Sequence, residues 1–400
     1  MRDNMNPVFL KAAPVLEKIE TAGYEAYFVG GSVRDYLLGK DISDVDIATS
    51  ATPMEIKGIF PRTADVGIEH GTVIVLYDGD SYEVTTFRSE SDYEDFRRPS
   101  KVDFIRSLDE DLKRRDFRMN SMAMSKDGRI IDPFGGQEDI RSKRIATVGN
   151  PLERFYEDAL RMMRAVRFAS QLSFQIDGET YEALVSEAYL LEKIAVERKL
   201  AEFEKLLAGE NSFMALKIMA DTGLSQHLPG LAGKKQELIS FAGRLDSGLL
   251  SEERWALLSA GLGHDFKTAE SFLRSWKMPV KKIRQIGKIL YWLQYRSVQN
   301  WTLESVYKAG AEAARNAERV LAATGDDSAD EEVPVRLYAS LPIRSTKELD
   351  VTGNDLIQWF NKPGGPWVKE LLGQVENSII SGHLANKKEE IRGWLECNQS

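Results

Sequence analysis

Strand-forming segments are confined to roughly the first 150 residues of this 400-residue chain, and this limits the folds open to it. Up to that point short β-rich segments alternate with helical ones. From about Pro151 onward the apolar residues recur at helical spacing only. Four hundred residues exceed what one hydrophobic core usually organises, and a hydrophobic content of 42% is enough for several cores. We therefore predict an α+β fold in which a mixed-sheet domain is followed by helical domains.

Composition excludes several classes of protein. No run of about 18 apolar residues could span a bilayer, and the first residues lack the apolar core of a signal peptide, so we expect a cytoplasmic protein with no membrane partner. The single cysteine, Cys397, allows no intrachain disulfide. A formal charge of −9 is unusual for a nucleic-acid binder. Basic residues nonetheless gather at 97–118 and 154–167, so this acidic protein could carry a basic cleft.

A glycine turn near the N-terminus predicts a phosphate-binding site. The segment 25–29 is predicted as a short strand that enters Gly30 and Gly31, and Ser32 begins a helix with Arg34 in its first turn. Glycine lets the backbone approach phosphate oxygens, and a guanidinium stabilises their negative charge. The three residues together are suited to a nucleoside triphosphate.

Two alternate carboxylates follow the glycine turn. The segment 44–48 is predicted as a strand, on which Asp44 and Asp46 share one face and could jointly bind Mg²⁺. Such a pair in isolation is more often a solvated strand face, but the preceding glycines and Arg34 favour catalysis. Glu83, on a second predicted strand, is the candidate third carboxylate, to orient the metal or accept a proton. A partly exposed strand carboxylate without function is an equally good interpretation of Glu83.

The remaining pattern predicts the following elements. Segments 72–77 and 81–87 should form a hairpin across Asp78-Gly79-Asp80, and the polar, aperiodic segment 89–100 should be a mobile loop over a site. Helices are predicted at 109–120 and 153–171, and the acidic break at 325–334 is predicted as a hinge.

Five short motifs in chain order resemble a known family: Gly30–Asp46, Arg114–Asn120, Asp132–Gly136, Glu157–Arg161 and Glu197–Phe203. They are similar to the motifs of the tRNA nucleotidyltransferases and bacterial poly(A) polymerases, within the superfamily that includes DNA polymerase beta. The chain most resembles the class II bacterial CCA-adding enzymes. One departure is Arg118-Met119, where Thr-Ile is more usual, and we expect it to affect rate or packing.

The resemblance implies an activity and a domain plan. It implies template-independent addition of the tRNA 3′-terminal CCA from CTP and ATP, with release of pyrophosphate and two Mg²⁺ ions held by Asp44 and Asp46. It also implies a polymerase-beta-like catalytic head at 1–148, a neck for nucleotide selection at 149–210, a helical body at 211–325 and a tRNA-binding tail at 326–400. A homodimer is left open.

The fourth motif offers a way to select a base without a nucleic-acid template. If one helix continues through this motif, Asp158 and Arg161 lie one turn apart, so that an acceptor stands beside a donor. Such a pair can match cytosine and adenine, whereas guanine and uracil would leave the charges mispaired. The resemblance makes Glu157 the residue that supports Arg161. It adds further residues that hold the nucleotide: Arg115, Arg164 and Arg167, with Asp116 either at the ribose or capping local backbone.

Parts of this sequence pattern also allow other functions. An A-only or CC-only enzyme, or a poly(A) polymerase, shares these motifs; the segment 89–100 argues against the CC-only type, and the A-only type stays open. A non-catalytic RNA-binding protein is disfavoured because every expected polar group is present. His264-Asp265 is better explained as a helix-end pair than as a phosphohydrolase centre. Four tryptophans are expected in cores rather than stacked on RNA: Trp276, Trp292, Trp359 and Trp367.

Overall fold

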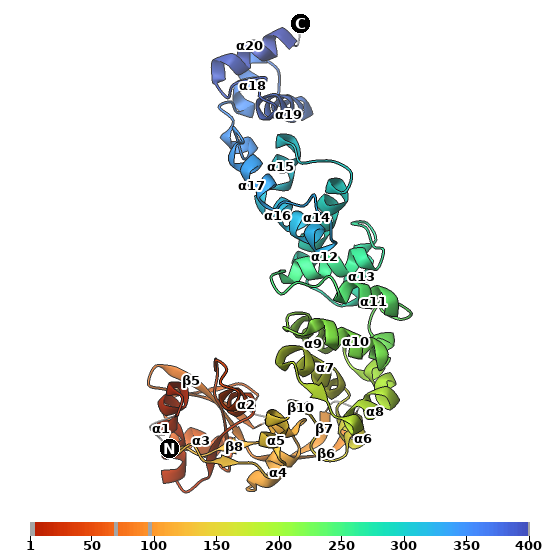
Figure 1. The fold of residues 1–400 in the computed structure, drawn as a ribbon. Coiled ribbons are helices and arrows are strands. Elements are labelled where there is room, and N and C mark those ends of the chain that lie inside the picture. Colours follow the sequence, from red (N-terminus) through yellow and green to blue (C-terminus); the bar gives the residue numbers. More distant parts are fainter. Residues whose placement is uncertain (1–4, 68–70, 95–97, 399–400) are drawn as a thin grey trace. The chain divides into compact units, whose positions relative to one another are not determined.

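The computed structural model describes residues 5–67, 71–94 and 98–398. The chain separates into two compact units, Met1–Lys235 and Gln236–Ser400 (Figure 1). The first unit contains a mixed sheet, and among the described residues the second contains helices only. The predicted α+β class is therefore confirmed, with strands confined to the N-terminal part of the chain.

A seven-stranded sheet organises the first unit, in the order β3-β4-β5-β2-β1-β8-β9. Neighbouring strands are antiparallel except β2 and β5, which run parallel. The predicted hairpin is confirmed as β4 and β5. The strands span β1 Ala26–Val29, β2 Asp46–Thr49, β3 Thr63–Asp65, β4 Thr72–Tyr77, β5 Asp80–Thr86, β8 Ala123–Met124 and β9 Ile130–Ile131.

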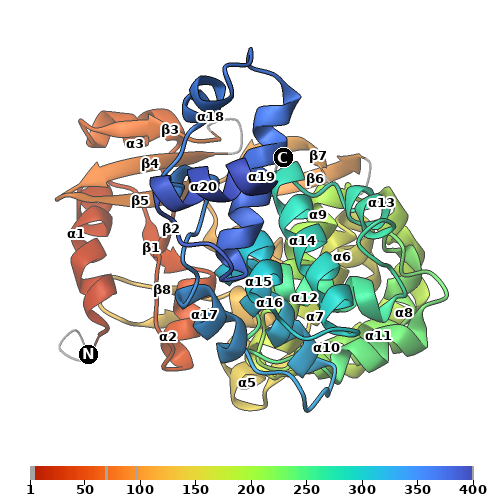
Figure 2. The ribbon, with the colours of Figure 1, turned by 90° about the horizontal axis from the view of Figure 1, so that it is seen from above.

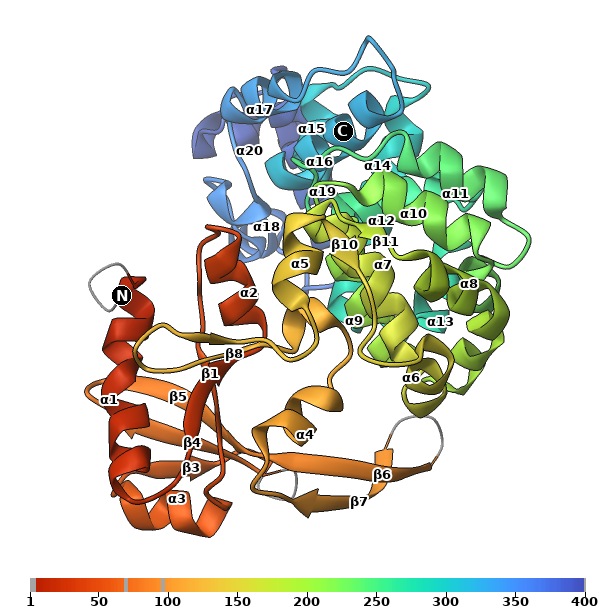
Figure 3. The same cartoon turned by 60° about the horizontal axis from the view of Figure 1, so that its bottom comes forward.

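One face of this sheet carries the main core of the unit. Helices α1 (Pro7–Thr21) and α3 (Pro53–Ile59) lie against it (Figures 2 and 3). Strand alternation directs Ile47 and Val84 toward these helices, and both side chains are fully buried there. Thr52 begins α3 with a capping box. Ile47 and Val84 are thus used on this face, so Asp46 and Glu83, each next to one of them along its strand, lie on the other.

The opposite face is covered at one end only. There Ala48 and Phe87 pack with Leu108 and Leu112 of α4 (Leu108–Lys113). Asp46 lies two residues before Ala48, and Glu83 four before Phe87, so both acidic residues belong to this face. Both carboxylates are exposed on this face.

Two predicted elements differ in the structure. The predicted loop at 89–100 is instead a separate antiparallel hairpin of β6 (Arg88–Glu94) and β7 (Arg98–Phe104), and residues 95–97 lie outside the described chain (Figure 3). The predicted helix at 109–120 is two elements, α4 and the short 3₁₀ helix η3 (Arg118–Asn120). Between them the chain bends at 114–117, which redirects the second motif toward the neck.

The helix predicted at 153–171 also differs in the structure. It is broken into α6 (Pro151–Glu157) and α7 (Leu160–Leu172), because Asp158 has an extended backbone with φ −141° and ψ 99°. α7 packs against α9 and α10. The other elements of this part are α5 Gly136–Arg141, β10 Arg144–Ile145, β11 Gln175–Ile176, α8 Gly178–Glu187, η4 Ala188–Lys193, α9 Val196–Leu207, α10 Ser212–Asp221 and η5 Leu224–His227.

The hydrophobic clusters described in the second unit include one that spans Trp292–Ala317 and one that spans Leu341–Leu395, and Tyr338 packs against both. α14 packs against both α12 and α16 (Figure 2). The predicted hinge at 325–334 is bonded to earlier helices, since Glu331 pairs with Arg315. The helices are α11 Lys235–Ala242, α12 Ser251–Gly261, α13 Ala269–Ser275, α14 Val280–Arg296, α15 Leu303–Ala309, α16 Ala311–Ala323, α17 Glu332–Ala339, η6 Thr346–Glu348, α18 Gly353–Phe360, α19 Pro366–Ile380 and α20 Lys388–Asn398.

Two expectations for this unit agree with its packing. Trp276 and Trp292 are buried, and Trp359 and Trp367 pack partly buried against the C-terminal cluster. Asp265 accepts the backbone N–H groups of Lys267 and Thr268, as a helix-end residue does. Within the described ranges no helix is both long and apolar enough to cross a bilayer.

Candidate active site

A cavity of about 830 Å³ in the first unit brings together residues from the sheet, α2 (Gly31–Leu37), the second motif, α7 and α9. Most of the predicted site residues line it: Gly30, Gly31, Arg34, Asp46, Glu83, Arg115, Asp116, Asp158, Arg161, Arg164 and Arg167. Asp44 and Glu157 are not part of the lining. The sequence motifs therefore converge on one place although they span more than 150 residues.

Asp46 and Glu83 face the cavity from neighbouring strands. They are directly opposite in the parallel pairing of β2 with β5, so the backbone ladder holds both carboxylates on one face. Burial, and next the charge of Glu83, raise the pKa of Asp46, while Arg115 opposes the shift. Asp44 precedes β2 instead of lying within it, is exposed, and accepts a hydrogen bond from Ser43 at 3.0 Å.

This carboxylate set fits a magnesium ion. Desolvation is the largest cause of the raised pKa of Asp46, and repulsion by Glu83 adds to it, so the two carboxylates stand close enough to interact electrostatically. Among the described residues no three His, Cys, Asp or Glu side chains form a closed metal site. Mg²⁺ is commonly bound by one or two carboxylates, with substrate phosphates and water completing its shell. Asp46 and Glu83 supply oxygen donors of that kind within the cavity, whereas Asp44 is not part of its lining.

Gly30 separates Asp46 from Arg115. A Cβ at Gly30 would lie 3.3 Å from Nη1 of Arg115 and 3.5 Å from Oδ2 of Asp46, and its φ of +73° disfavours other residues. Arg115 is held from behind by Asp111, whose Oδ2 accepts from Nη2 of Arg115 at 3.1 Å. Burial alone would raise the pKa of Asp111, but Arg115 and Arg114 outweigh it and hold that pKa below its ordinary value.

A chain of hydrogen bonds joins the glycine turn to the neck. Arg34 donates to Oδ1 of Asn120 at 2.7 Å, and Asn120 donates to Oδ1 of Asp116 at 3.3 Å. Asp116 accepts from Arg164 of α7 at 2.7 Å and also from the backbone of Phe117. Burial opposes ionisation of Asp116, yet Arg164 outweighs it and lowers the pKa to about 2. Asp116 is thus an ionised anchor that also caps local backbone.

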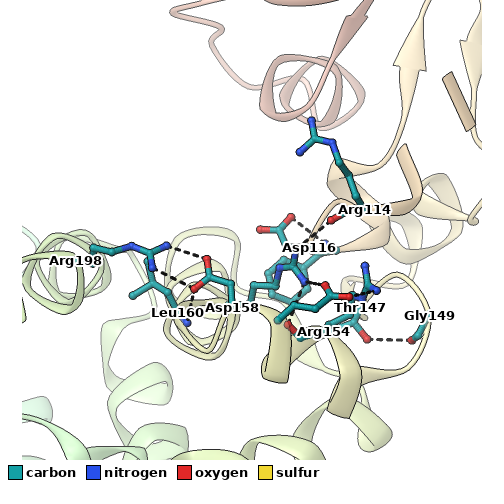
Figure 4. A network of polar contacts seen from close by, with 11 residues as sticks. Arg114, Asp116, Thr147, Gly149, Arg154, Asp158, Leu160 and Arg198 are labelled. Atoms are coloured by element: carbon teal, nitrogen blue, oxygen red, sulfur yellow. Dashed lines mark hydrogen bonds and ion pairs between the residues drawn. The ribbon is translucent and has the colours of Figure 1, made fainter. Parts of the chain in front are cut away.

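The two members of the fourth motif are held by different partners. Asp158 accepts from Arg198 of α9 at 2.8 and 3.2 Å, and it also caps α7 through the N–H of Leu160 (Figure 4). Arg161 is buried and donates to Glu157 at 2.6 Å, so the expected contact between Arg161 and Glu157 is confirmed. The helical geometry predicted for Asp158 and Arg161 is wrong because α6 ends before Asp158. Both side chains still line the cavity.

Three functional contacts were not assigned from the sequence. Arg198 holds Asp158, Asn120 bridges Arg34 and Asp116, and Asp111 holds Arg115. Arg198 lies in the fifth motif and Asn120 ends the second, so both were visible as motif positions. Their partners lie 40 and 86 residues away, and no local pattern reports such a pairing.

Family models match this chain in three segments. The model described as Poly A polymerase head domain matches residues 26–146, and the model for a probable RNA and SrmB-binding site of polymerase A matches 173–234. A putative tRNA nucleotidyltransferase domain 2 matches 250–395. The head-domain match covers the sheet that carries Asp46 and Glu83.

Curated relatives and solved structures agree with these models. The chain is 50% identical to the CCA-adding enzyme of Geobacillus stearothermophilus over 395 residues, which is 98% of this chain and 97% of the relative. The crystal structure of the Bacillus stearothermophilus CCA-adding enzyme in complex with CTP has a TM-score of 0.91 at 48% identity, covering 99% of this chain and 98% of that one. A Thermotoga maritima CCA-adding enzyme complexed with tRNA, at 22% identity and TM-score 0.65, shares the fold over 99% of this chain and 97% of its own. The chain therefore belongs to the CCA-adding enzymes, the tRNA nucleotidyltransferases that carry a poly(A) polymerase head domain.

Proposed function

We propose that this enzyme builds and repairs the complete 3′-terminal CCA of tRNA in the cytoplasm, using CTP and ATP and releasing pyrophosphate. The observation that carries the proposal is the cavity in which Asp46 and Glu83 stand opposite each other while the fourth-motif pair, Asp158 and Arg161, lines the same space. A reaction centre and a base-selecting pair share one cavity. Relatives that are about half identical bear the name CCA-adding enzyme, and one is solved with CTP.

The carboxylates would prepare the phosphoryl transfer. Asp44 and Asp46 would hold two Mg²⁺ ions, which supply activation of the tRNA 3′-hydroxyl and neutralisation of the leaving pyrophosphate. Glu83 would orient this centre or accept the hydroxyl proton. Arg34, Arg115, Arg164 and Arg167 would fix the triphosphate so that the hydroxyl meets the α-phosphate in line, which makes the chain's contribution mainly positioning and electrostatics.

Base selection would fall to Asp158 and Arg161. Arg161 is positioned by Glu157, and its guanidinium donates where cytosine and adenine accept. Asp158 accepts the exocyclic amino group, for which it has to share or release its bond to Arg198. Guanine and uracil reverse this donor and acceptor order, and a mispaired charge in a desolvated cavity is costly.

The helical parts would hold the RNA. On the domain plan of head 1–148 and neck 149–210, the body 211–325 and tail 326–400 would grip the acceptor arm by shape and phosphate charge. The A-only alternative shares every motif, and poly(A) polymerase shares the head domain that matches at 26–146. Neither is favoured by a feature of the cavity.

Labelled tRNA transcripts distinguish these activities. Transcripts ending before the first C, after one C and after both are incubated with single labelled nucleotides. We expect CTP to be added to the first two and ATP to the third, with extension stopping after one A. Absence of CTP incorporation on the shortest transcript would identify an A-only enzyme, and long adenosine tails on unrelated RNA would identify a poly(A) polymerase.

Asp46→Ala tests whether the site is catalytic. Removal of this carboxylate should reduce nucleotide addition by on the order of a thousandfold or more. The affinity for tRNA, measured by filter binding, should stay within a few-fold. An active variant would remove the metal role from Asp46, and loss of tRNA binding together with activity would indicate a folding defect instead.

A further inference from the structure

Phe168 of α7 has three arginines of the cavity around a single ring. The guanidinium carbon of Arg167 lies 3.9 Å from the ring centroid, that of Arg34 lies 5.2 Å away, and that of Arg164 lies 5.6 Å away. All four residues line the cavity. Arg34 comes from α2 beside the glycine turn and the other two from the neck helix, so the ring lies where these elements meet.

The ring is held in place by its surroundings. Phe168 is buried, with 3% of its surface exposed, and its ring meets that of Phe117 edge-on at a centroid distance of 5.7 Å and an angle of 84°. Phe117 is itself fully buried and is bridged to Thr147. A ring fixed in this way offers cations an invariant surface.

Three guanidinium groups this close together repel one another. Each has one acidic partner, namely Asp35 for Arg34, Asp116 for Arg164 and Glu202 for Arg167. These carboxylates each pair with a single arginine, whereas an aromatic ring attracts all nearby cations through the negative potential of its face. The ring thus attracts all three guanidinium groups without adding a negative charge, which would repel the triphosphate proposed to bind in the cavity.

We propose that Phe168 is a positioning residue that gathers Arg34, Arg164 and Arg167 into one receptor for the nucleoside triphosphate. The inference rests on the proposed function and deepens it, because it assigns nucleotide affinity to a residue without a polar atom. Phe168 acts through the arginines and not on the reacting atoms. Its loss should weaken nucleotide binding more than the chemical step.

An ordinary core aromatic would have the same burial, so the test has to separate ring electrostatics from packing. Phe168 is replaced by mono-, di- and trifluorinated phenylalanine, which progressively weaken the negative potential of the ring and change its size little. KM for CTP and ATP, kcat and KM for tRNA are measured for each variant. We expect the nucleotide KM to rise with each added fluorine, by about tenfold across the series, with kcat and tRNA KM nearly constant.

Phe155 of α6 provides the matched control. It is a fully buried neck aromatic over whose ring the described residues place no cation. The same fluorinated series at Phe155 should leave the nucleotide KM unchanged, and thermal melting should show that all variants fold. A flat KM at Phe168, or equal slopes at both positions, would overturn the inference. If the unsubstituted enzyme fails to add CTP and ATP, the proposed function fails instead.

Discussion

At the level of single residues, the environment of Asp46 disfavours the ionised form that the proposed metal site requires. Burial and the charge of Glu83 both favour its protonated form, and Arg115 opposes them only in part. The site therefore keeps a carboxylate whose proton is held more tightly than usual. A cation that displaces this proton also relieves the repulsion between Asp46 and Glu83.

The pH dependence of activity should follow from this carboxylate. Because the pKa of Asp46 is raised, kcat/KM for nucleotide should fall with decreasing pH already above the usual aspartate pKa of about 3.9. Glu83→Gln removes the second cause of the shift, so the acid limb of its residual activity should move to lower pH. The measurement is single-nucleotide addition from pH 4 upward, and an unmoved limb would dissociate Glu83 from the titration of Asp46.

At this scale the sequence was informative wherever a residue's role depends on local spacing. The glycine turn predicted Gly30 and Arg34, which both line the cavity, whereas the strand face predicted to be shared by Asp44 and Asp46 is not observed because β2 begins at Asp46. Nothing local indicates that Asp111 holds Arg115 or that Asn120 bridges two motifs, because those bonds form only when separate elements meet.

Among the elements, the break between α6 and α7 determines how the proposed base-selecting pair, Asp158 and Arg161, is held. Asp158 is fixed by α9 through Arg198, and Arg161 is fixed by α6 through Glu157. The two groups can therefore be perturbed one at a time. The prediction of one continuous helix would instead have held Asp158 and Arg161 on the same element.

Two substitutions should separate recognition from support. Asp158→Ala should relax the preference for CTP and ATP over UTP and GTP by about tenfold or more, while tRNA affinity stays nearly unchanged. Arg198→Met leaves the carboxylate in place but unheld, and should relax the preference by a smaller factor. Competition assays with all four nucleotides measure both effects, and unchanged selectivity in Asp158→Ala would refute the selecting role.

The start of α5 depends on a close backbone approach. A Cβ at Gly136 would fall well inside contact distance of the Arg118 carbonyl and 3.0 Å from Cγ of Met122. Gly136→Ala should destabilise the protein by about 2 kcal/mol. Gly58→Ala in α3, where a Cβ meets nothing within 4 Å, should be neutral or stabilise it by about 0.5 kcal/mol. Urea unfolding compares the two, and equal effects would contradict the packing argument.

Element type was predictable where one face of a segment is apolar, and less so elsewhere. α1, β4, β5 and the long helices of the second unit show such a face. The β6 and β7 hairpin is polar over most of its length, and only Val102 and Phe104 alternate at its end, so the sequence gives little of the period of two that marks a half-buried strand. Asp158 has an extended backbone, and its carboxylate is paired with Arg198, a tertiary contact that helical propensity does not include.

For the whole molecule, a net charge of −9 coexists with a cavity whose lining includes eight arginines: Arg34, Arg88, Arg114, Arg115, Arg161, Arg164, Arg167 and Arg198. The net charge therefore does not predict the affinity of this protein for a polyanion such as tRNA. Local potential decides, because exposed charges farther away than a Debye length are screened.

Salt should weaken tRNA binding despite the net negative charge. Phosphate contacts release counterions, so the dissociation constant should rise by about tenfold or more between about 50 and 200 mM monovalent salt. Titration of labelled tRNA by fluorescence anisotropy gives the slope, and a synthetic neutral-backbone oligonucleotide of the acceptor sequence is the control. An affinity for tRNA independent of salt would contradict an electrostatic grip.

The parallel pairing of β2 with β5 has a consequence for how this enzyme can fail. Asp46 and Glu83 are spaced by backbone hydrogen bonds and not by a flexible loop, and slippage by one residue would turn Glu83 to the apolar face. If the pairing of β2 with β5 is lost, the proposed reaction centre should therefore lose all activity and not only part of it. On heating, loss of activity should coincide with loss of the β-sheet signal in circular dichroism. The time for which the enzyme stays active would then be set by the rate at which the seven-stranded sheet unfolds.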